Sequence, residues 1–175
     1  MEKITLKDKT FRKVISYEQL SAAIDAVACK INADFKNCDD VPVLLCVLNG
    51  SIMFTAELMK RFQFNCQVVS TKLTSYEGTG STGNVKQALG LTADIQGRRV
   101  IVVEDIVDTG FTLSTVVKIL KSYNPASIEI ASLLDKPSMR KVDDLKLKYV
   151  GFVVPAEFVV GYGLDYNELY RQLPY

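Results

Sequence analysis

The sequence predicts an α/β fold, a doubly wound and mostly parallel sheet with helices on both faces. Patterns typical of strands and helices alternate along the 175 residues. Residues 43–48 (VLLCVL) form a short, continuous apolar run, as expected for a strand that is covered on both faces. The chain contains no linker, repeat or low-complexity segment, so we expect a single domain over residues 1–175.

The individual elements follow from the spacing of apolar residues and from the turns between them. Ser16 and Gln19 have the spacing of a capping box, and apolar residues then recur at helical spacing as far as about Phe35. The polar, glycine-rich residues 74–86 interrupt this regular pattern. In order, we expect a helix ending near residue 35, a strand at 43–48, a helix at 52–64, strands at 66–73 and 99–104, a helix at 112–123, and strands at 127–134, 149–154 and 158–160.

Composition excludes several classes of function. The net charge of +1 provides no basic excess, which argues against a nucleic-acid partner held by bulk electrostatics. No apolar run approaches the roughly 20 residues of a membrane-spanning helix, and the N-terminus has no signal-peptide pattern, so we expect no membrane partner and a cytoplasmic location. The four cysteines include no C-x-x-C pair, which does not fit a zinc site. Because the chain has no histidine, any metal has to be a hard ion with oxygen ligands.

An acidic cluster stands at the end of one predicted strand. Glu104, Asp105 and Asp108 follow directly on an apolar run, and like charges this close raise one another's pKa. The cluster therefore needs a cation, hydroxyl donors or water. Ligands of parallel sheets bind beyond the carboxyl ends of the strands, and we expect the turns at 49–51 and 108–112 to open on that same edge.

The turn at 108–112 has the composition of an anion-binding site. It leads into a helix, whose first backbone amides and dipole attract a phosphate, and it carries two threonine hydroxyls. With the acidic pair in front of it, the turn favours a sugar phosphate together with a metal ion. The same residues also fit a simpler interpretation, in which Thr112 is a helix N-cap and Asp108 an ordinary turn residue.

Five segments resemble a known family. Residues 102–112 (VVEDIVDTGFT) are similar to the phosphoribosyl-pyrophosphate-binding signature of type I phosphoribosyltransferases. The segments that resemble the hypoxanthine-guanine branch of that family are VLNGS at 47–51, SYEGTGSTG at 75–83, LLDKPSMR at 133–140 and FVVGYGLDYNELYR at 158–171. The resemblance implies the type I phosphoribosyltransferase fold, with a small hood and a mobile loop, in a homodimer or homotetramer.

The resemblance also implies a reaction. The enzyme would transfer the 5-phosphoribosyl group from phosphoribosyl pyrophosphate to N9 of hypoxanthine or guanine, with Mg²⁺ as cofactor. The products would be IMP or GMP and pyrophosphate, and the pathway would be purine salvage. The alternatives are a non-catalytic regulator that senses phosphoribosyl pyrophosphate and a transferase for adenine, orotate or uracil.

Each residue of the site takes a role from this resemblance. Asp108 would accept the N7 proton of the purine, Lys136 would donate to its 6-oxo group, and Phe158 would stack on its ring. The other implied roles are ribose and Mg²⁺ binding by Glu104 and Asp105, 5′-phosphate binding by Thr109, Gly110, Phe111 and Thr112, pyrophosphate binding by Leu48, Asn49, Gly50 and Arg171, contact with the base edge by Val159, binding of a second Mg²⁺ by Asp165, and a closing lid at Ser75 and Tyr76.

Two residues depart from the family pattern, and several have simpler interpretations when taken singly. Asn49 and Phe111 stand where some members carry lysine, which removes positive charge near two phosphate sites and bears on affinity rather than on the reaction. Whether the peptide before Asn49 is cis stays open. In isolation, Phe158 would be a core residue, Lys136 a solvated loop lysine and Arg171 a surface ion-pair partner.

Overall fold

The computed structural model describes residues 3–72 and 91–175. Its elements are β1 (Lys3–Leu6), β2 (Lys9–Arg12), α1 (Tyr17–Phe35), β3 (Val43–Val47), α2 (Ile52–Met59), β4 (Gln67–Thr71), β5 (Arg99–Val107), α4 (Phe111–Lys121), β6 (Ser127–Asp135), the 3₁₀ helix η1 (Pro137–Met139) and β7 (Tyr149–Val153). No helix within these two stretches is long and apolar enough to cross a membrane. The expected segment at 74–86, which includes Ser75 and Tyr76, lies outside the described residues.

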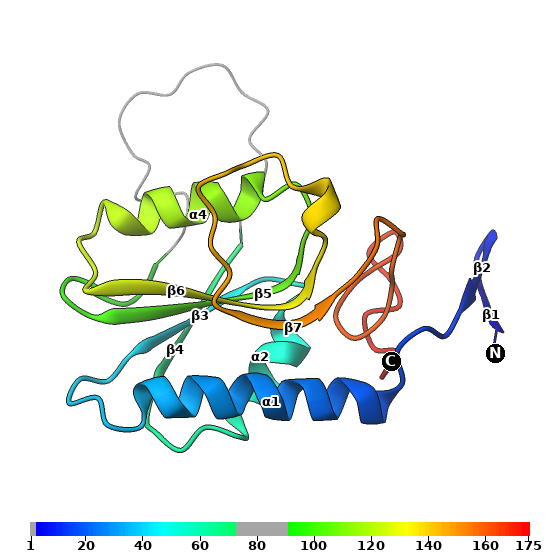
Figure 1. Cartoon of the computed structure of the whole chain (residues 1–175). Helices are drawn as coiled ribbons and strands as arrows, with labels where there is room; N and C mark the ends of the chain where they lie inside the picture. Colours follow the sequence, from blue (N-terminus) through cyan, green and yellow to red (C-terminus); the bar gives the residue numbers. More distant parts are fainter. Residues whose placement is uncertain (1–2, 73–90) are drawn as a thin grey trace.

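A five-stranded sheet forms the centre of the fold, with the strand order β4-β3-β5-β6-β7 (Figure 1). All four neighbouring pairs are parallel. In Figure 1, α4 lies on one face of the sheet and α1 and α2 lie on the other. The predicted doubly wound, mostly parallel α/β architecture is confirmed.

Each face of the sheet carries its own apolar core. All five residues of β3 are buried, as the continuous apolar run predicts. Leu44 and Ile101 belong to the core that includes α1, whereas Leu45 and Val102 belong to the core that includes α4. This alternation follows from the two-residue period of side chains along a strand.

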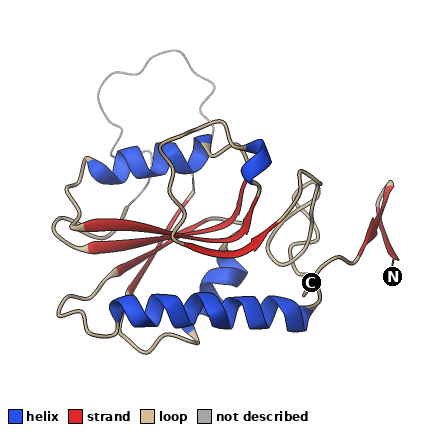
Figure 2. Ribbon diagram, in the orientation of Figure 1, coloured by secondary structure: helices blue, strands red, loops and turns tan. Residues whose placement is uncertain are grey.

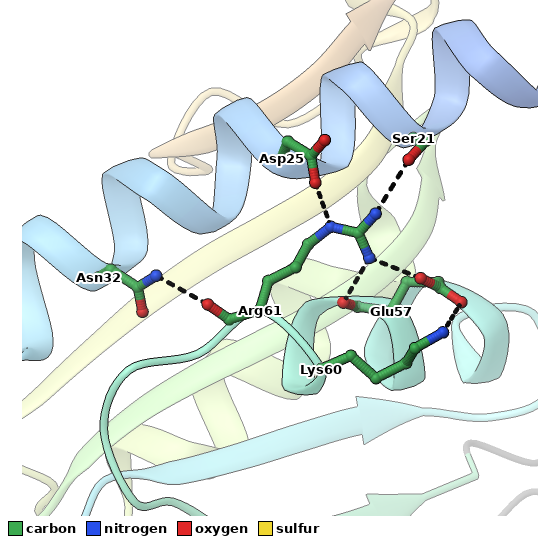
Figure 3. A network of polar contacts seen from close by, with 6 residues as sticks. All are labelled: Ser21, Asp25, Asn32, Glu57, Lys60 and Arg61. Atoms are coloured by element: carbon green, nitrogen blue, oxygen red, sulfur yellow. Dashed lines mark hydrogen bonds and ion pairs between the residues drawn. The ribbon is translucent and has the colours of Figure 1, made fainter.

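Polar contacts between α1 and α2 determine where α2 ends. The capping box at the start of α1 is confirmed, with reciprocal hydrogen bonds between Ser16 and Gln19. From α1, Asn32 Nδ2 donates to the backbone oxygen of Arg61 at 2.9 Å (Figure 3), and Asn32 Oδ1 accepts from the backbone nitrogen of Gln63 at 2.9 Å. Because these backbone groups bond to α1, α2 ends at Met59, and the predicted helix at 52–64 is too long.

The C-terminal segment differs most from the sequence expectation. Residues 155–175, here called the hood, contain only the isolated bridges Gly161↔Leu164 and Tyr166↔Leu169 and appear as loops in Figure 2. The predicted strand at 158–160 is therefore wrong. Directly after it, Gly161, Tyr162 and Gly163 have φ angles of +100°, +47° and +100°, a left-handed run that turns the chain back and cannot continue a strand.

An antiparallel hairpin, β1 with β2, precedes α1 and was not expected from the sequence. Its register runs from Lys3↔Arg12 to Leu6↔Lys9, and it is separate from the central sheet. Its two-residue turn contains no glycine or asparagine, the usual signals of such a turn. The hairpin lies beside the hood at one end of the molecule (Figure 1).

Candidate active site

The acidic cluster lies at the carboxyl end of β5, which continues three residues beyond the predicted end at Glu104. The register with β6 pairs Glu104 with Ser132 and Ile106 with Leu134 and omits Asp105. The Asp105 carboxylate instead accepts a hydrogen bond from the backbone nitrogen of Ile106 at 2.8 Å. Burial of Glu104, which is only 9% exposed, and the adjacent charge of Asp105 raise the pKa of Glu104 well above its usual value.

The turn after β5 lines a pocket of about 210 Å³ together with the end of the strand. The residues of the predicted site in this pocket are Glu104, Asp108, Thr109, Gly110 and Thr112. Gly110, with φ of +83°, is the N-cap of α4, so the N-cap interpretation of Thr112 is wrong. Since glycine has no side chain to cap the helix, the first amides of α4 are available to an anion.

Lys136 meets Asp108 at the edge of this pocket. Its Nζ lies 3.0 Å from Asp108 Oδ1, and the lysine is only 6% exposed. The backbone nitrogen of Lys136 donates to the oxygen of Val107 at 3.0 Å, which fixes the lysine beside the end of β5. The interpretation of Lys136 as a solvated loop lysine is therefore wrong.

Two charged residues that support the turn were not singled out from the sequence. Asp135 and Arg140 flank η1 and form an ion pair that is largely buried. A side chain at Gly110 would come within 2.6 Å of Val142 and 3.1 Å of Arg140, so this loop packs directly under the turn. Both charges belong to the LLDKPSMR segment, but the sequence does not show that they pair with each other.

The turn at 48–51 lies against the same end of the sheet. The peptide between Leu48 and Asn49 is cis. The hydroxyl of Ser51 donates to the backbone oxygen of Val47 at 2.7 Å and closes the turn onto β3. A side chain at Gly50 would collide with the Asp105 carboxylate, so the two predicted turns do meet at one edge.

The hood also contacts this edge of the sheet. A side chain at Gly163 would collide with the backbone oxygen of Gly50. Arg171 donates to the backbone oxygen of Gly163 at 2.8 Å and pairs with Asp165 at 2.8 Å. The structure therefore brings Asp165, Arg171 and Gly50 into one neighbourhood.

Phe158 differs from its simpler interpretation as a core residue. It is 61% exposed, whereas the next residue, Val159, is half-buried and packs against the core. Phe111, the first residue of α4, is also exposed. A free aromatic face at position 158 is what stacking on a planar ligand requires.

Residues 16–167 match the family model for the phosphoribosyl transferase domain. The chain belongs to the phosphoribosyltransferase family. This match covers the sheet, both turns and most of the hood, so the family resemblance predicted from the sequence is confirmed.

Individual relatives have more specific names than the family model. This phosphoribosyltransferase is 44% identical to the hypoxanthine-guanine phosphoribosyltransferase of Staphylococcus epidermidis over 163 residues, which cover 93% of this chain and 89% of the relative. It is 41% identical over 167 residues to the hypoxanthine phosphoribosyltransferase of Buchnera aphidicola, covering 95% and 94% of the two chains. A crystal structure of a hypoxanthine-guanine phosphoribosyltransferase from Bacillus anthracis matches with a TM-score of 0.83 at 38% identity, covering 94% of each chain.

Proposed function

We propose that this phosphoribosyltransferase joins the 5-phosphoribosyl group of phosphoribosyl pyrophosphate to N9 of hypoxanthine or guanine, forming IMP or GMP and pyrophosphate in purine salvage. The Lys136–Asp108 pair is the observation that carries this proposal. A 6-oxopurine presents the O6 acceptor and the N7–H donor side by side on one edge. An ammonium 3.0 Å from a carboxylate offers the complementary donor and acceptor. The names of the relatives support the same substrates.

The chain's own residues account for the steps of such a transfer. The bond from the ribose anomeric carbon to pyrophosphate breaks, N9 forms the new bond, and the N7 proton passes to Asp108. The turn at 109–112 would hold the 5′-phosphate, while Glu104 and Asp105 would accept hydrogen bonds from the ribose hydroxyls. Leu48, Asn49, Gly50 and Arg171 would bind pyrophosphate, and Val159 would contact the base edge through its backbone.

We also propose Mg²⁺ as the cofactor, held by Glu104 and Asp105, with a second ion at Asp165. Within the described ranges, neither Glu104 nor Asp105 forms an ion pair with lysine or arginine. Burial first, and then the adjacent charge of Asp105, raise the pKa of Glu104. Mg²⁺ commonly takes one or two protein carboxylates and completes its shell with water and substrate oxygens. Within residues 3–72 and 91–175, no three acidic, cysteine or histidine side chains gather as a metal site, so substrate and water oxygens would have to supply the remaining ligands. When bound, Mg²⁺ stabilises the charge of the departing pyrophosphate.

The proposed substrates are tested by mixing the purified protein with phosphoribosyl pyrophosphate, Mg²⁺ and one base at a time. Pyrophosphate release is expected with hypoxanthine and guanine and not with adenine or orotate. Release only with adenine, orotate or uracil would assign a different base. Binding of phosphoribosyl pyrophosphate without release by any base would favour the regulator.

We further propose that residues 1–175 act as one domain in a cytoplasmic homodimer or homotetramer. The family resemblance supports this assembly. Light scattering should then give a mass close to two or four times 19.5 kDa. A mass of one chain at working concentration would contradict it.

A further inference from the structure

Three aromatic rings meet where the N-terminal hairpin contacts the hood. The ring centroids of Phe11 and Phe158 are 6.2 Å apart with an interplanar angle of 47°, and those of Phe158 and Tyr166 are 5.9 Å apart at 73°. Phe11 and Tyr166 complete the triangle at 5.9 Å and 60°. Tilted and edge-on pairs at these distances are the favourable arrangements of aromatic rings. The orientation of Phe158 is thus set partly by a residue from the opposite end of the chain.

Polar contacts fasten the same hairpin to the hood. The Tyr166 hydroxyl donates to Asp8 Oδ1 at 2.5 Å, and the ammonium of Lys9 lies 5.4 Å from the centroid of the Tyr166 ring. Arg12 pairs with Glu157, the neighbour of Phe158, at 3.5 Å. The turn between β1 and β2 contacts residues that surround Phe158, and β2 does so as well.

Neither partner in this contact belongs to the central sheet. Phe158 lies in a loop rather than in a strand, so no sheet hydrogen bonds fix its backbone. The hairpin is not paired with the central sheet, and a two-stranded hairpin alone is only marginally stable. Because Phe158 stays 61% exposed, Phe11 and Tyr166 cover only part of the ring and leave area for another planar group.

We propose that Phe11 is a positioning residue for the purine, because it holds the ring of Phe158 in the orientation that stacks on the base. This inference rests on the proposed function and extends it to a segment outside the family match, which begins at residue 16. Through Phe11, the hairpin thereby orients the side chain that contacts the purine base.

The role is tested with Phe11→Leu, which keeps apolar bulk and removes the ring. Thr10→Ala is the matched control, since Thr10 is the adjacent exposed residue of β2, has no aromatic ring, and has its hydroxyl 3.4 Å from that of Thr5 in β1. In Phe11→Leu the KM for hypoxanthine should rise roughly 3- to 10-fold, as expected for loss of an aromatic pair contact. The KM for phosphoribosyl pyrophosphate and the unfolding temperature should match those of the control.

A double-mutant cycle with Phe158→Leu shows whether Phe11 changes the KM for hypoxanthine through Phe158 or through a general effect on the enzyme. If Phe11 acts through Phe158, Phe11→Leu should change the KM for hypoxanthine little further in the Phe158→Leu background. An undiminished effect in that background, or an equal rise in both KM values, would overturn the positioning role. So would an active Phe11→Leu enzyme with the wild-type KM for hypoxanthine. A wild-type protein that neither converts hypoxanthine nor binds IMP would instead refute the proposed function, and this role with it.

Discussion

At the scale of single residues, the pairing of Lys136 with Asp108 carries most of the functional argument. A buried ammonium needs a counter-charge, and Asp108 provides it at 3.0 Å. An ammonium has three protons, so Lys136 can stay paired with the Asp108 carboxylate while it donates a hydrogen bond to a 6-oxo group. The family resemblance implies a role for each of these residues, but their contact is visible only in the fold.

Asp108→Asn tests the assignment of the base. Asparagine keeps the shape of the side chain but cannot accept the N7 proton, so turnover should fall by about 10²- to 10⁴-fold, the usual cost of losing a general base. The affinity for phosphoribosyl pyrophosphate should change little. Asp39→Asn, at an exposed aspartate away from the site, is the control for steady-state kinetics. Turnover of Asp108→Asn within a few-fold of the control would refute the assignment.

At the scale of helices and strands, apolar runs predicted where elements start better than where they end. The apolar run at 43–48 predicted β3 (Val43–Val47) to within one residue. By contrast, β5 continues to Val107 because β6 pairs with it up to Asp135, a partner that local sequence does not reveal. α2 ends early because Asn32 bonds to the backbone beyond it. The hairpin was missed because its two-residue turn, residues 7–8, lacks the glycine or asparagine that usually marks such a turn.

The contact between α1 and β7 makes stability depend on pH. Asp34 Oδ2 accepts a hydrogen bond from the Tyr149 hydroxyl at 2.7 Å and pairs with Lys148 at 3.1 Å. These contacts, the Tyr149 bond first, lower the pKa of Asp34 below its ordinary value of 3.8. A lowered carboxyl pKa contributes stability above the ordinary value, and this contribution is lost as the pH falls through the folded-state pKa.

Asp34→Asn should therefore destabilise the protein near neutral pH and much less in acid. Because the pair is half-exposed, the loss in unfolding free energy at pH 7 should be about 0.5–1 kcal/mol. Urea unfolding of the wild type, Asp34→Asn and the control Asp39→Asn at pH 7 and pH 3 measures the difference. A gap that stays constant or widens toward pH 3 would contradict the ionised state of Asp34.

At the scale of the whole molecule, parallel topology predicted the location of the site. Because β3 and β5 run in the same direction, the turns after them open on one edge, and Gly50 does contact Asp105 there. The contacts that complete this edge are between distant parts of the chain, such as Gly163 with Gly50 and Phe11 with Phe158. A single sequence carries no spacing signal for such contacts.

Metal removal tests whether the acidic residues at this edge of the sheet bind a cation. Because Glu104 and Asp105 concentrate negative charge, EDTA should abolish turnover, and Mg²⁺ or Mn²⁺ should restore it. Mg²⁺ together with phosphoribosyl pyrophosphate should also raise the unfolding temperature more than either does alone, since a ligand bound only by the folded state stabilises it. Full activity in metal-free buffer would show that these carboxylates do not serve a cation.

The recognition of a 6-oxopurine by Lys136 is tested most directly by kcat/KM for hypoxanthine and for adenine, measured on the wild type and on Lys136→Gln. The wild type should favour hypoxanthine by roughly 10⁴-fold, because adenine places an amino group against the ammonium. In Lys136→Gln, loss of a charge-assisted bond of about 1.5–3 kcal/mol should lower the hypoxanthine value by one to two decades. The decisive quantity is the ratio of kcat/KM for hypoxanthine to kcat/KM for adenine. Loss of the charge that pairs with Asp108 should lower both values alike and leave this ratio unchanged. A narrowed ratio is the predicted result, and an unchanged ratio would show that Lys136 does not read the 6-position.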